Sequence, residues 1–204
     1  FYKNNSNNNI YNSIINISEK SDNIYNKSHL VPFGEFLPFR KKFHEVYKSL
    51  GINIHDITPG DFSKILNIKS FIAHPLICYE SIFSNESLVL NEKADFILNV
   101  SNDGWFGDTL APYQHLDALA MRSLENQRYS VRSTNTGISA IISHKGIIED
   151  YVKFSKTGII NRKIISRNGN TPLSKYGYKI IYFLFFIVFL YSTIYFNIKI
   201  FKRL

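Results

Sequence analysis

The chain has 204 residues, a single cysteine and a net charge of +8 at pH 7. This length is sufficient for one domain with a hydrophobic core, while one cysteine excludes an internal disulfide and a multi-cysteine zinc site. No basic run is interleaved with aromatic residues as in a nucleic-acid groove, so we expect no nucleic-acid partner. The positive charge instead suits an anionic membrane surface or simple solubility.

The N-terminal quarter of the chain has short polar and apolar segments in turn. Its patterns predict a low-complexity polar loop at 4–9, a strand at 11–17 and a turn at 19–23. They also predict a returning strand at 22–30 and a short helix at 41–50. Gly51 follows the predicted helix directly and is suited to close it.

The middle of the chain predicts alternating strands and helices. Residues 70–77 and 94–100 predict core strands, and the second is almost continuously apolar, as expected for a strand covered on both faces. Pro112 begins a predicted helix that extends to about Arg128. Its apolar face comprises Leu116, Leu119, Ala120 and Leu124. A hairpin is predicted from 138–142 and 146–152 around the turn at 144–146. This alternation predicts an α/β sandwich.

The C-terminal region predicts a membrane-spanning helix. Residues 180–198 contain no charged side chain, and this length crosses roughly 30 Å of hydrocarbon at about 1.5 Å per residue. A core helix does not need to be apolar on every face for so long. We expect a juxtamembrane linker at 173–179 and a basic tail at 199–204. Basic residues occur on both sides of the span, so local charge does not decide its orientation.

Polar residues follow the two predicted core strands at the points where loops begin. Cys78 comes directly after the first strand. Spacing alone favours a buried, inert cysteine, but a cysteine at a strand end that opens into a loop can be a nucleophile. Lys27 and Glu35 lie upstream in a segment made irregular by Pro32 and Gly34. A lysine beside a thiol favours the thiolate and can later hold an oxyanion.

Several motifs together resemble one family. They are KSHLVPFGE at 27–35, ICYE at 77–80, NVSNDGWFGD at 99–108, Gln114–His115, Arg122, Glu125, Arg128, Arg132 and TNTG at 134–137. In this order they resemble the apolipoprotein N-acyltransferases of the nitrilase superfamily, over about residues 11–150. The resemblance implies a nitrilase-like αββα sandwich within residues 1–172, incomplete at its N-terminal side and followed by one transmembrane helix.

The resemblance also implies a set of site residues. Cys78 matches the nucleophile and Lys27 the lysine of a Glu-Lys-Cys triad. The supporting residues are Glu35, Tyr79, Glu80 and Trp105, the last as a mobile wall of an acyl pocket. In the family the general-base glutamate lies well upstream of the lysine, whereas the only acidic residues before Lys27 here are Glu19 and Asp22. Neither fits the motif of the base, so none is assigned, and the chain resembles the C-terminal part of the enzyme.

Simpler interpretations exist for most of these residues. Lys27 is otherwise a solvated lysine, Glu35 and Glu80 surface carboxylates, and Trp105 a core residue. The arginines at 122, 128 and 132 with Glu125 form either a solvated helix face or, as we favour, a buried ion-pair network. Asn135 and Gly137 are expected to form a turn. The histidines have no metal-ligand spacing, so we expect neither a metal nor a cofactor.

The resemblance implies N-acylation of the N-terminal diacylglyceryl-cysteine of lipoproteins. A phospholipid of the phosphatidylethanolamine type would donate the acyl group through a cysteine thioester, and a diacylated apolipoprotein would accept it. The implied location is the bacterial inner membrane, with the catalytic domain on the periplasmic side. Two alternatives stay open: a nitrilase-type amidase acting on a small amide, for which a membrane span has no use, and a catalytically inactive fragment that lacks the general base.

Overall fold

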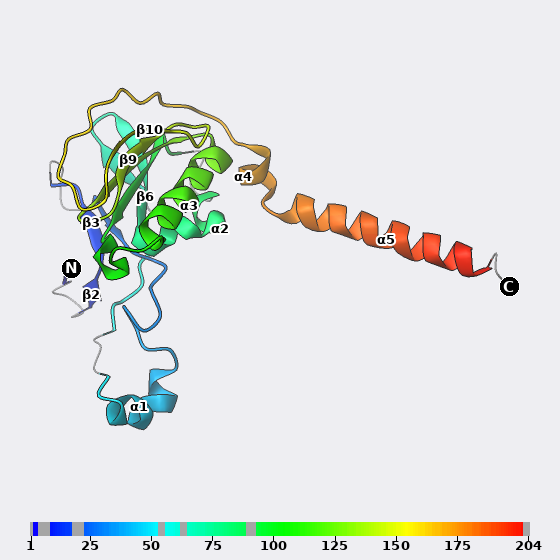
Figure 1. The fold of residues 1–204 in the computed structure, drawn as a ribbon, viewed down its shortest axis with the longest axis horizontal. Coiled ribbons are helices and arrows are strands. Elements are labelled where there is room, and N and C mark those ends of the chain that lie inside the picture. The colour runs from blue at the N-terminus through cyan, green and yellow to red at the C-terminus, as the bar shows by residue number, and fades with distance from the viewer. Residues whose placement is uncertain are drawn as a thin grey trace.

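The computed structural model describes residues 2–3, 9–17, 23–52, 56–61, 65–88 and 93–201. Figure 1 shows a domain built around a sheet, from which helix α5 projects, while helix α1 lies at the end of a long loop. The strands are β1 (Tyr2–Lys3), β2 (Ile10–Tyr11), β3 (Ser13–Ile15), β4 (Ile24–Asn26), β5 (Leu66–Ile68), β6 (Phe71–Ile77), β7 (Phe96–Ser101), β8 (Tyr129–Thr134), β9 (Ser139–Ile142) and β10 (Ile148–Val152). The helices are α1 (Arg40–Ser49), α2 (Ser84–Leu88), α3 (Ala111–Asn126), α4 (Pro172–Tyr176), α5 (Lys179–Phe201) and the 3₁₀ helices η1 (Cys78–Ile82) and η2 (Asp103–Phe106).

The main sheet has six strands in the order β10-β9-β8-β7-β6-β5. The central strands β6, β7 and β8 are parallel, and the outer pairs are antiparallel. Helix α3 lies between β7 and β8 in the chain, as the crossover that a parallel pair requires. The carboxyl ends of β6 and β7 therefore meet at one edge, where α/β folds commonly place a site.

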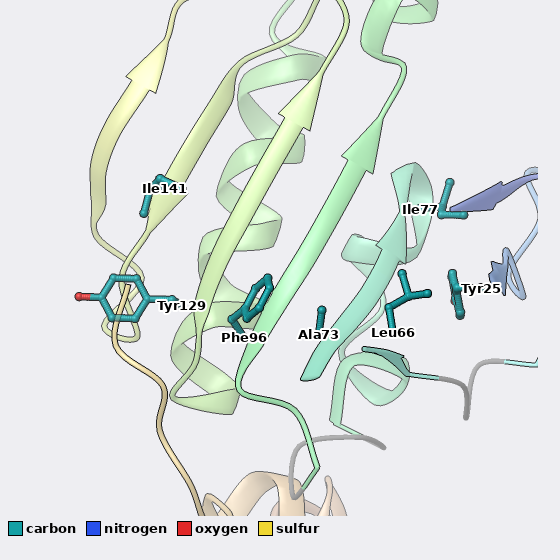
Figure 2. Packing of buried hydrophobic residues seen from close by; sticks show 7 residues of the cluster. All are labelled: Tyr25, Leu66, Ala73, Ile77, Phe96, Tyr129 and Ile141. Atoms are coloured by element: carbon teal, nitrogen blue, oxygen red, sulfur yellow. The ribbon is translucent and has the colours of Figure 1, made fainter. Parts of the chain in front are cut away.

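The two faces of this sheet carry separate hydrophobic clusters. On one face, α3 packs Leu116 and Leu119 against the sheet residues Leu76, Ile97, Ala140 and Ile142. Figure 2 shows the other cluster in front of the sheet, with α3 behind it. This cluster comprises Tyr25, Leu66, Ala73, Ile77, Phe96, Tyr129 and Ile141. Because Tyr25 belongs to the β3–β4 pair, that pair forms part of a second β layer. The predicted α/β architecture, with a sheet covered on both faces, is thus present.

Most predicted elements are present with small shifts of their ends. Strands β6 and β7, helices α1 and α3 and the β9–β10 hairpin all lie where the sequence predicts them. The predicted strand pair near the N-terminus is present as β3 and β4, with Ile14 opposite Tyr25. Gly51 has φ 68°, as expected after the end of α1.

Some predictions were wrong or fall outside the described residues. The sequence analysis assigned no strand to 129–134, yet β8 lies in the centre of the sheet. Leu124 was placed on the apolar face of its helix, but it is 44% exposed because it lies near the end of α3, beside the turn at Gly146. The predicted polar loop and turn, with Glu19 and Asp22, lie almost wholly outside the described residues, as do Lys202 and Arg203.

Helix α5 has 23 residues, which corresponds to a length of about 35 Å. By length and composition its segment Lys179–Phe196 is able to cross a membrane, with a mean hydropathy of 1.9 and no part buried against the protein. The short helix α4 occupies part of the predicted linker, and Thr171 caps it by accepting a hydrogen bond from the Ser174 amide.

Candidate active site

Cys78 lies at the carboxyl end of β6 and begins η1. Its φ of 50° places it in the left-handed region, which costs a residue with a side chain about 1–2 kcal/mol and is found preferentially at functional sites. The side chain is half-buried and packs against the cluster of Figure 2. The inert-core interpretation does not account for this backbone conformation, whereas a nucleophile presented at a sharp turn does.

Lys27 follows β4 and is 1% exposed. Its Nζ lies 2.7 Å from Oε2 of Glu35. The same carboxylate accepts hydrogen bonds from Asn12 Nδ2, at 2.9 Å, and from the Val31 amide, at 2.8 Å. A buried ammonium needs such a paired and hydrogen-bonded partner. The interpretation of Lys27 as a solvated lysine is therefore wrong, and the irregular segment predicted from Pro32 and Gly34 brings the two charges together.

Glu80 connects the Lys27 loop to the Cys78 turn. Its side chain is fully buried. Oε1 accepts hydrogen bonds from Tyr25 Oη, the Ser28 amide and hydroxyl, and the His29 amide. Oε2 accepts one from the Ile77 amide, at 2.6 Å. Burial, followed by the charge of Glu80, raises the pKa of Tyr25, so that this hydroxyl stays a donor. Glu80 is therefore not a surface carboxylate. It links the Lys27 loop to the Cys78 turn through hydrogen bonds.

Tyr79 and Trp105 differ in how they are held. The Tyr79 ring contacts the rings of His29 and Phe83 edge-on, at centroid distances of 5.7 and 4.9 Å. Trp105, in η2, is 85% exposed, so its interpretation as a core residue is wrong. The loop that carries it is tied to the TNTG segment, because Asn135 Nδ2 donates to Asn102 Oδ1 at 2.6 Å.

A polar network lies beneath the Cys78 turn. His115 Nε2 lies 2.9 Å from both the Cys78 carbonyl oxygen and Ser81 Oγ, and His115 Nδ1 lies 3.1 Å from Asp103 Oδ1. Arg132 donates to Asp103 Oδ2 at 2.6 Å. Burial alone would raise the pKa of Asp103, but hydrogen bonds from His115 and Ser101 and the Arg132 charge together lower it to about 2. Asp103 is therefore ionised at neutral pH.

The remaining arginines are structural, as favoured from the sequence. Arg122 pairs with Glu125 at 2.8 Å and also donates to the Ile82 carbonyl. The buried Arg128 donates to the carbonyls of Ala94 and Gly169, at 2.8 and 2.9 Å. These contacts hold the segments around α3 together and leave the chemistry to the edge at Cys78.

Ser81, Asp103 and His115 also belong to the site, although they were not predicted as site residues. A signal existed for Asp103, because β6 and β7 are parallel neighbours and residues after their carboxyl ends converge. No spacing rule connects His115 to either strand end, since it comes from the first turns of α3. Within the residues that the structure describes, no three His, Cys, Asp or Glu side chains are grouped to hold a metal ion.

The sheet and the residues at its carboxyl edge are consistent with the carbon-nitrogen hydrolase family. That family matches residues 1–166, and the chain belongs to it. In the solved structures, Saccharomyces cerevisiae Nit3, a member of branch 10 of the nitrilase superfamily, aligns with a TM-score of 0.54 and 19% identity, covering 88% of this chain and 60% of that chain. This likeness shows the fold.

Among curated proteins the chain is similar to apolipoprotein N-acyltransferases, which confirms the resemblance. It is 37% identical to that of Wigglesworthia glossinidia brevipalpis over 179 residues, covering 83% of this chain and 36% of the relative. It is 42% identical to that of Methylococcus capsulatus over 140 residues, covering 68% and 28% respectively. The chain thus spans about a third of the length of the curated relatives it matches. Their name and helix α5 indicate a membrane-associated protein.

Proposed function

We propose that this chain carries the nucleophile of an enzyme that N-acylates the N-terminal diacylglyceryl-cysteine of lipoproteins. The observation that carries the proposal is Cys78, held in a left-handed turn at a sheet edge beside the loop of the buried Lys27–Glu35 pair. The names of the relatives and the apolar helix α5 support a lipid substrate. An amidase for small soluble amides would need no such helix.

The first half of the reaction forms a thioester. The Cys78 thiolate attacks the ester carbonyl of a phospholipid of the phosphatidylethanolamine type, and the C–O bond breaks as the lysophospholipid leaves with a proton. Cysteine suits this step because its thiolate is a strong nucleophile. In this proposal Lys27 and the Tyr79 backbone N–H stabilise the oxyanion of the tetrahedral intermediate.

The second half transfers the acyl group. The α-amine of the diacylated apolipoprotein attacks the thioester, an amide forms and the C–S bond breaks, and the released Cys78 sulfur takes up the proton that the amine loses. In this scheme Glu35 holds Lys27, Glu80 holds the Lys27 loop against the Cys78 turn, and Tyr79 lines the site. Trp105 is proposed as a wall of the acyl pocket because its exposed indole lies on the loop after β7, a neighbour of β6.

The assay follows labelled acyl transfer from phosphatidylethanolamine to a diacylated lipopeptide by the full-length protein. We expect transfer that Cys78→Ala abolishes and that Cys78→Ser nearly abolishes, because an alkoxide forms far less readily than a thiolate. Hydrolysis of small amides without lipopeptide acylation would instead support the amidase alternative.

The general base is not assigned to a residue of this chain. We therefore expect this chain, purified in detergent, to transfer acyl groups about 10²–10⁴-fold more slowly than the apolipoprotein N-acyltransferase of Wigglesworthia glossinidia brevipalpis, the usual loss without a positioned base. Turnover at the full rate, abolished by Cys78→Ala, would contradict this. Glu19 and Asp22, the acidic residues before Lys27, would then be the first to mutate.

We further propose that the protein lies in the bacterial inner membrane, with the sheet domain on the periplasmic side and residues 199–204 in the cytoplasm. The basic residues after α5 suit a cytoplasmic end. A reporter fused after Leu204 tests this. Alkaline phosphatase activity at that position would contradict the orientation, and fluorescence of a reporter that folds only in the cytoplasm is the expected result.

A further inference from the structure

We propose that Asp103, His115 and Arg132 form a clamp that fixes the Cys78 carbonyl and thereby aims the Tyr79 amide N–H at the reacting carbonyl oxygen. The three are positioning residues, because the inference assigns them no contact with substrate. The inference rests on the proposed function, since it assumes that Cys78 attacks a carbonyl group. It adds to that function a group of side chains that orient the oxyanion site through the Cys78 carbonyl.

The first step concerns the peptide unit between Cys78 and Tyr79. A carbonyl oxygen only accepts hydrogen bonds, so the contact of His115 Nε2, 2.9 Å away, is a hydrogen bond when that nitrogen carries the ring hydrogen, and Ser81 Oγ donates to the same oxygen at 3.0 Å. In a trans peptide the C=O and the next N–H point in opposite directions within one plane. Holding the carbonyl of Cys78 toward α3 therefore turns the Tyr79 N–H toward the other side of the turn.

The Tyr79 N–H lies near the start of η1. Cys78 begins η1, so Tyr79 lies in the first turn of a helix. Amides of a first turn have no partner within their own helix. They are suited to a developing negative charge when their direction is fixed in advance. The left-handed φ of Cys78 restricts its backbone, and the hydrogen bonds to its carbonyl oxygen add a second constraint on the direction of the Tyr79 N–H.

Buried charged residues hold His115 in place. Asp103, His115 and Arg132 are all buried. Asp103 contacts His115 Nδ1, and Arg132 donates to Asp103, to the Ile138 carbonyl and to Asn99 Oδ1. Asn99 in turn donates to the Leu76 carbonyl at 2.9 Å. The clamp is thus anchored in β6, β7 and β8, and the sheet sets its position.

Gly137 gives an independent way to disturb the clamp. A Cβ at this position would lie 2.1 Å from Asp103 Oδ2 and 2.7 Å from Asp103 Cβ. Real Cβ contacts are never so short, so Gly137→Ala must displace the Asp103 carboxylate. The clash falls on Oδ2, the oxygen to which Arg132 donates, whereas His115 contacts Oδ1. The glycine of the TNTG motif therefore serves this close approach as well as a turn.

The experiment compares three reactions of Cys78 in the full-length protein. Thioester formation from phospholipid and hemithioacetal formation with hexanal both place an oxygen in the proposed oxyanion site. Alkylation by iodoacetamide forms an S–C bond with loss of iodide and needs no such site. The variants are His115→Ala, His115→Gln and Gly137→Ala. The control is Arg128→Lys, in another buried arginine, which donates to the carbonyls of Ala94 and Gly169.

We expect His115→Ala to slow thioester formation by about 10²–10³-fold and to weaken the hexanal adduct, with an unchanged KM for phospholipid and a nearly unchanged alkylation rate. His115→Gln retains a donor and should recover part of the loss. Gly137→Ala should follow His115→Ala, and Arg128→Lys should lose thermal stability only.

Three results would overturn the clamp: a wild-type rate of thioester formation in folded His115→Ala, an equal loss of alkylation, or no difference between Gln and Ala at position 115. Absence of thioester in the wild-type protein would refute the proposed function. The hexanal and iodoacetamide arms would still decide the clamp.

Discussion

The Cys78 edge of the sheet and helix α5 place side chains in opposite ways. Around Cys78 the charged groups are buried, namely Lys27, Glu80, Asp103 and Arg132. Along α5 the large apolar side chains are exposed, among them Phe183, Phe185 and Phe189. Buried charges persist only where partners and hydrogen bonds replace water, and an exposed apolar helix is stable only where its surroundings are also apolar. The comparison indicates a sheet edge fixed by internal pairing, where we propose the chemistry, and a helix suited to lipid.

The largest effect is expected where a buried charge also serves the reaction. Lys27→Met removes the ammonium from the site and leaves Glu35 without its ion-pair partner, and acyl transfer should fall by about 10²–10³-fold. The double variant Lys27→Met/Glu35→Gln should regain stability but not activity, since the cation is still missing. Lys41→Met, at an exposed lysine of α1, is the matched control. Transfer by Lys27→Met at the rate of this control would refute the role of Lys27.

A charge placed on α5 tests the other side of the comparison. Phe189→Arg lies near the middle of the helix and should cost about 2.5–3.5 kcal/mol of insertion free energy. The measurement places residues 173–204 in a carrier protein and scores the fraction that a translocon inserts into membranes. Phe189→Leu should insert like the natural segment. Equal insertion of the arginine variant would mean that α5 does not cross the bilayer.

Glu80→Gln tests whether the joint between the Lys27 loop and the Cys78 turn depends on charge. A glutamine must turn its NH₂ group toward one of the donors that Glu80 now accepts, so a donor faces a donor. We expect a loss of about 2 kcal/mol in unfolding free energy, the range for a buried charged hydrogen bond. Glu45→Gln on the exposed face of α1 should be neutral in the same denaturation experiment. Equal stability of both variants would contradict this.

The burial of His74 predicts how the stability of the folded protein depends on pH. Burial lowers its pKa from 6.5 to about 4, so between these values the unfolded chain binds a proton that the folded protein does not. Stability is therefore retained above pH 6.5 and lost as the pH falls, by about 2 kcal/mol at pH 5 for this group. Thermal unfolding at pH 7 and pH 5 should show this loss. His74→Gln should show a smaller one, and the same pH dependence in both proteins would contradict the assignment.

The sequence predicted the elements whose patterns follow burial. Strand β7 and helix α3 were found because apolar residues dominate one or both faces. Strand β8 was missed because its α3-facing positions are polar. There Ser130 contacts Ser123 at 2.6 Å, and Arg132 pairs with Asp103. Tyr129 and Val131 alternate with these polar residues, but such alternation predicts a polar face in solvent, whereas here the polar face is buried against α3 and η2.

The site shows the same limit. Motifs indicated Cys78, Lys27 and Glu80 as site residues. In the structure, Glu80 accepts hydrogen bonds from the loop after Lys27 and from the residue before Cys78. His115 was not identified, because its role depends on the direction of one carbonyl group at a left-handed residue. Backbone direction of this kind is set by tertiary contacts and leaves no mark in residue spacing.

The central claim is that Cys78 carries the acyl group. Full-length protein incubated with phosphatidylethanolamine and no acceptor, then examined by intact mass spectrometry, should gain one acyl chain. Hydroxylamine should remove it, because it cleaves thioesters, and a diacylated lipopeptide should remove it by accepting the acyl group. Cys78→Ala should gain nothing. An acyl adduct that persists in Cys78→Ala, or a protein that transfers acyl groups without ever gaining this mass, would contradict the account.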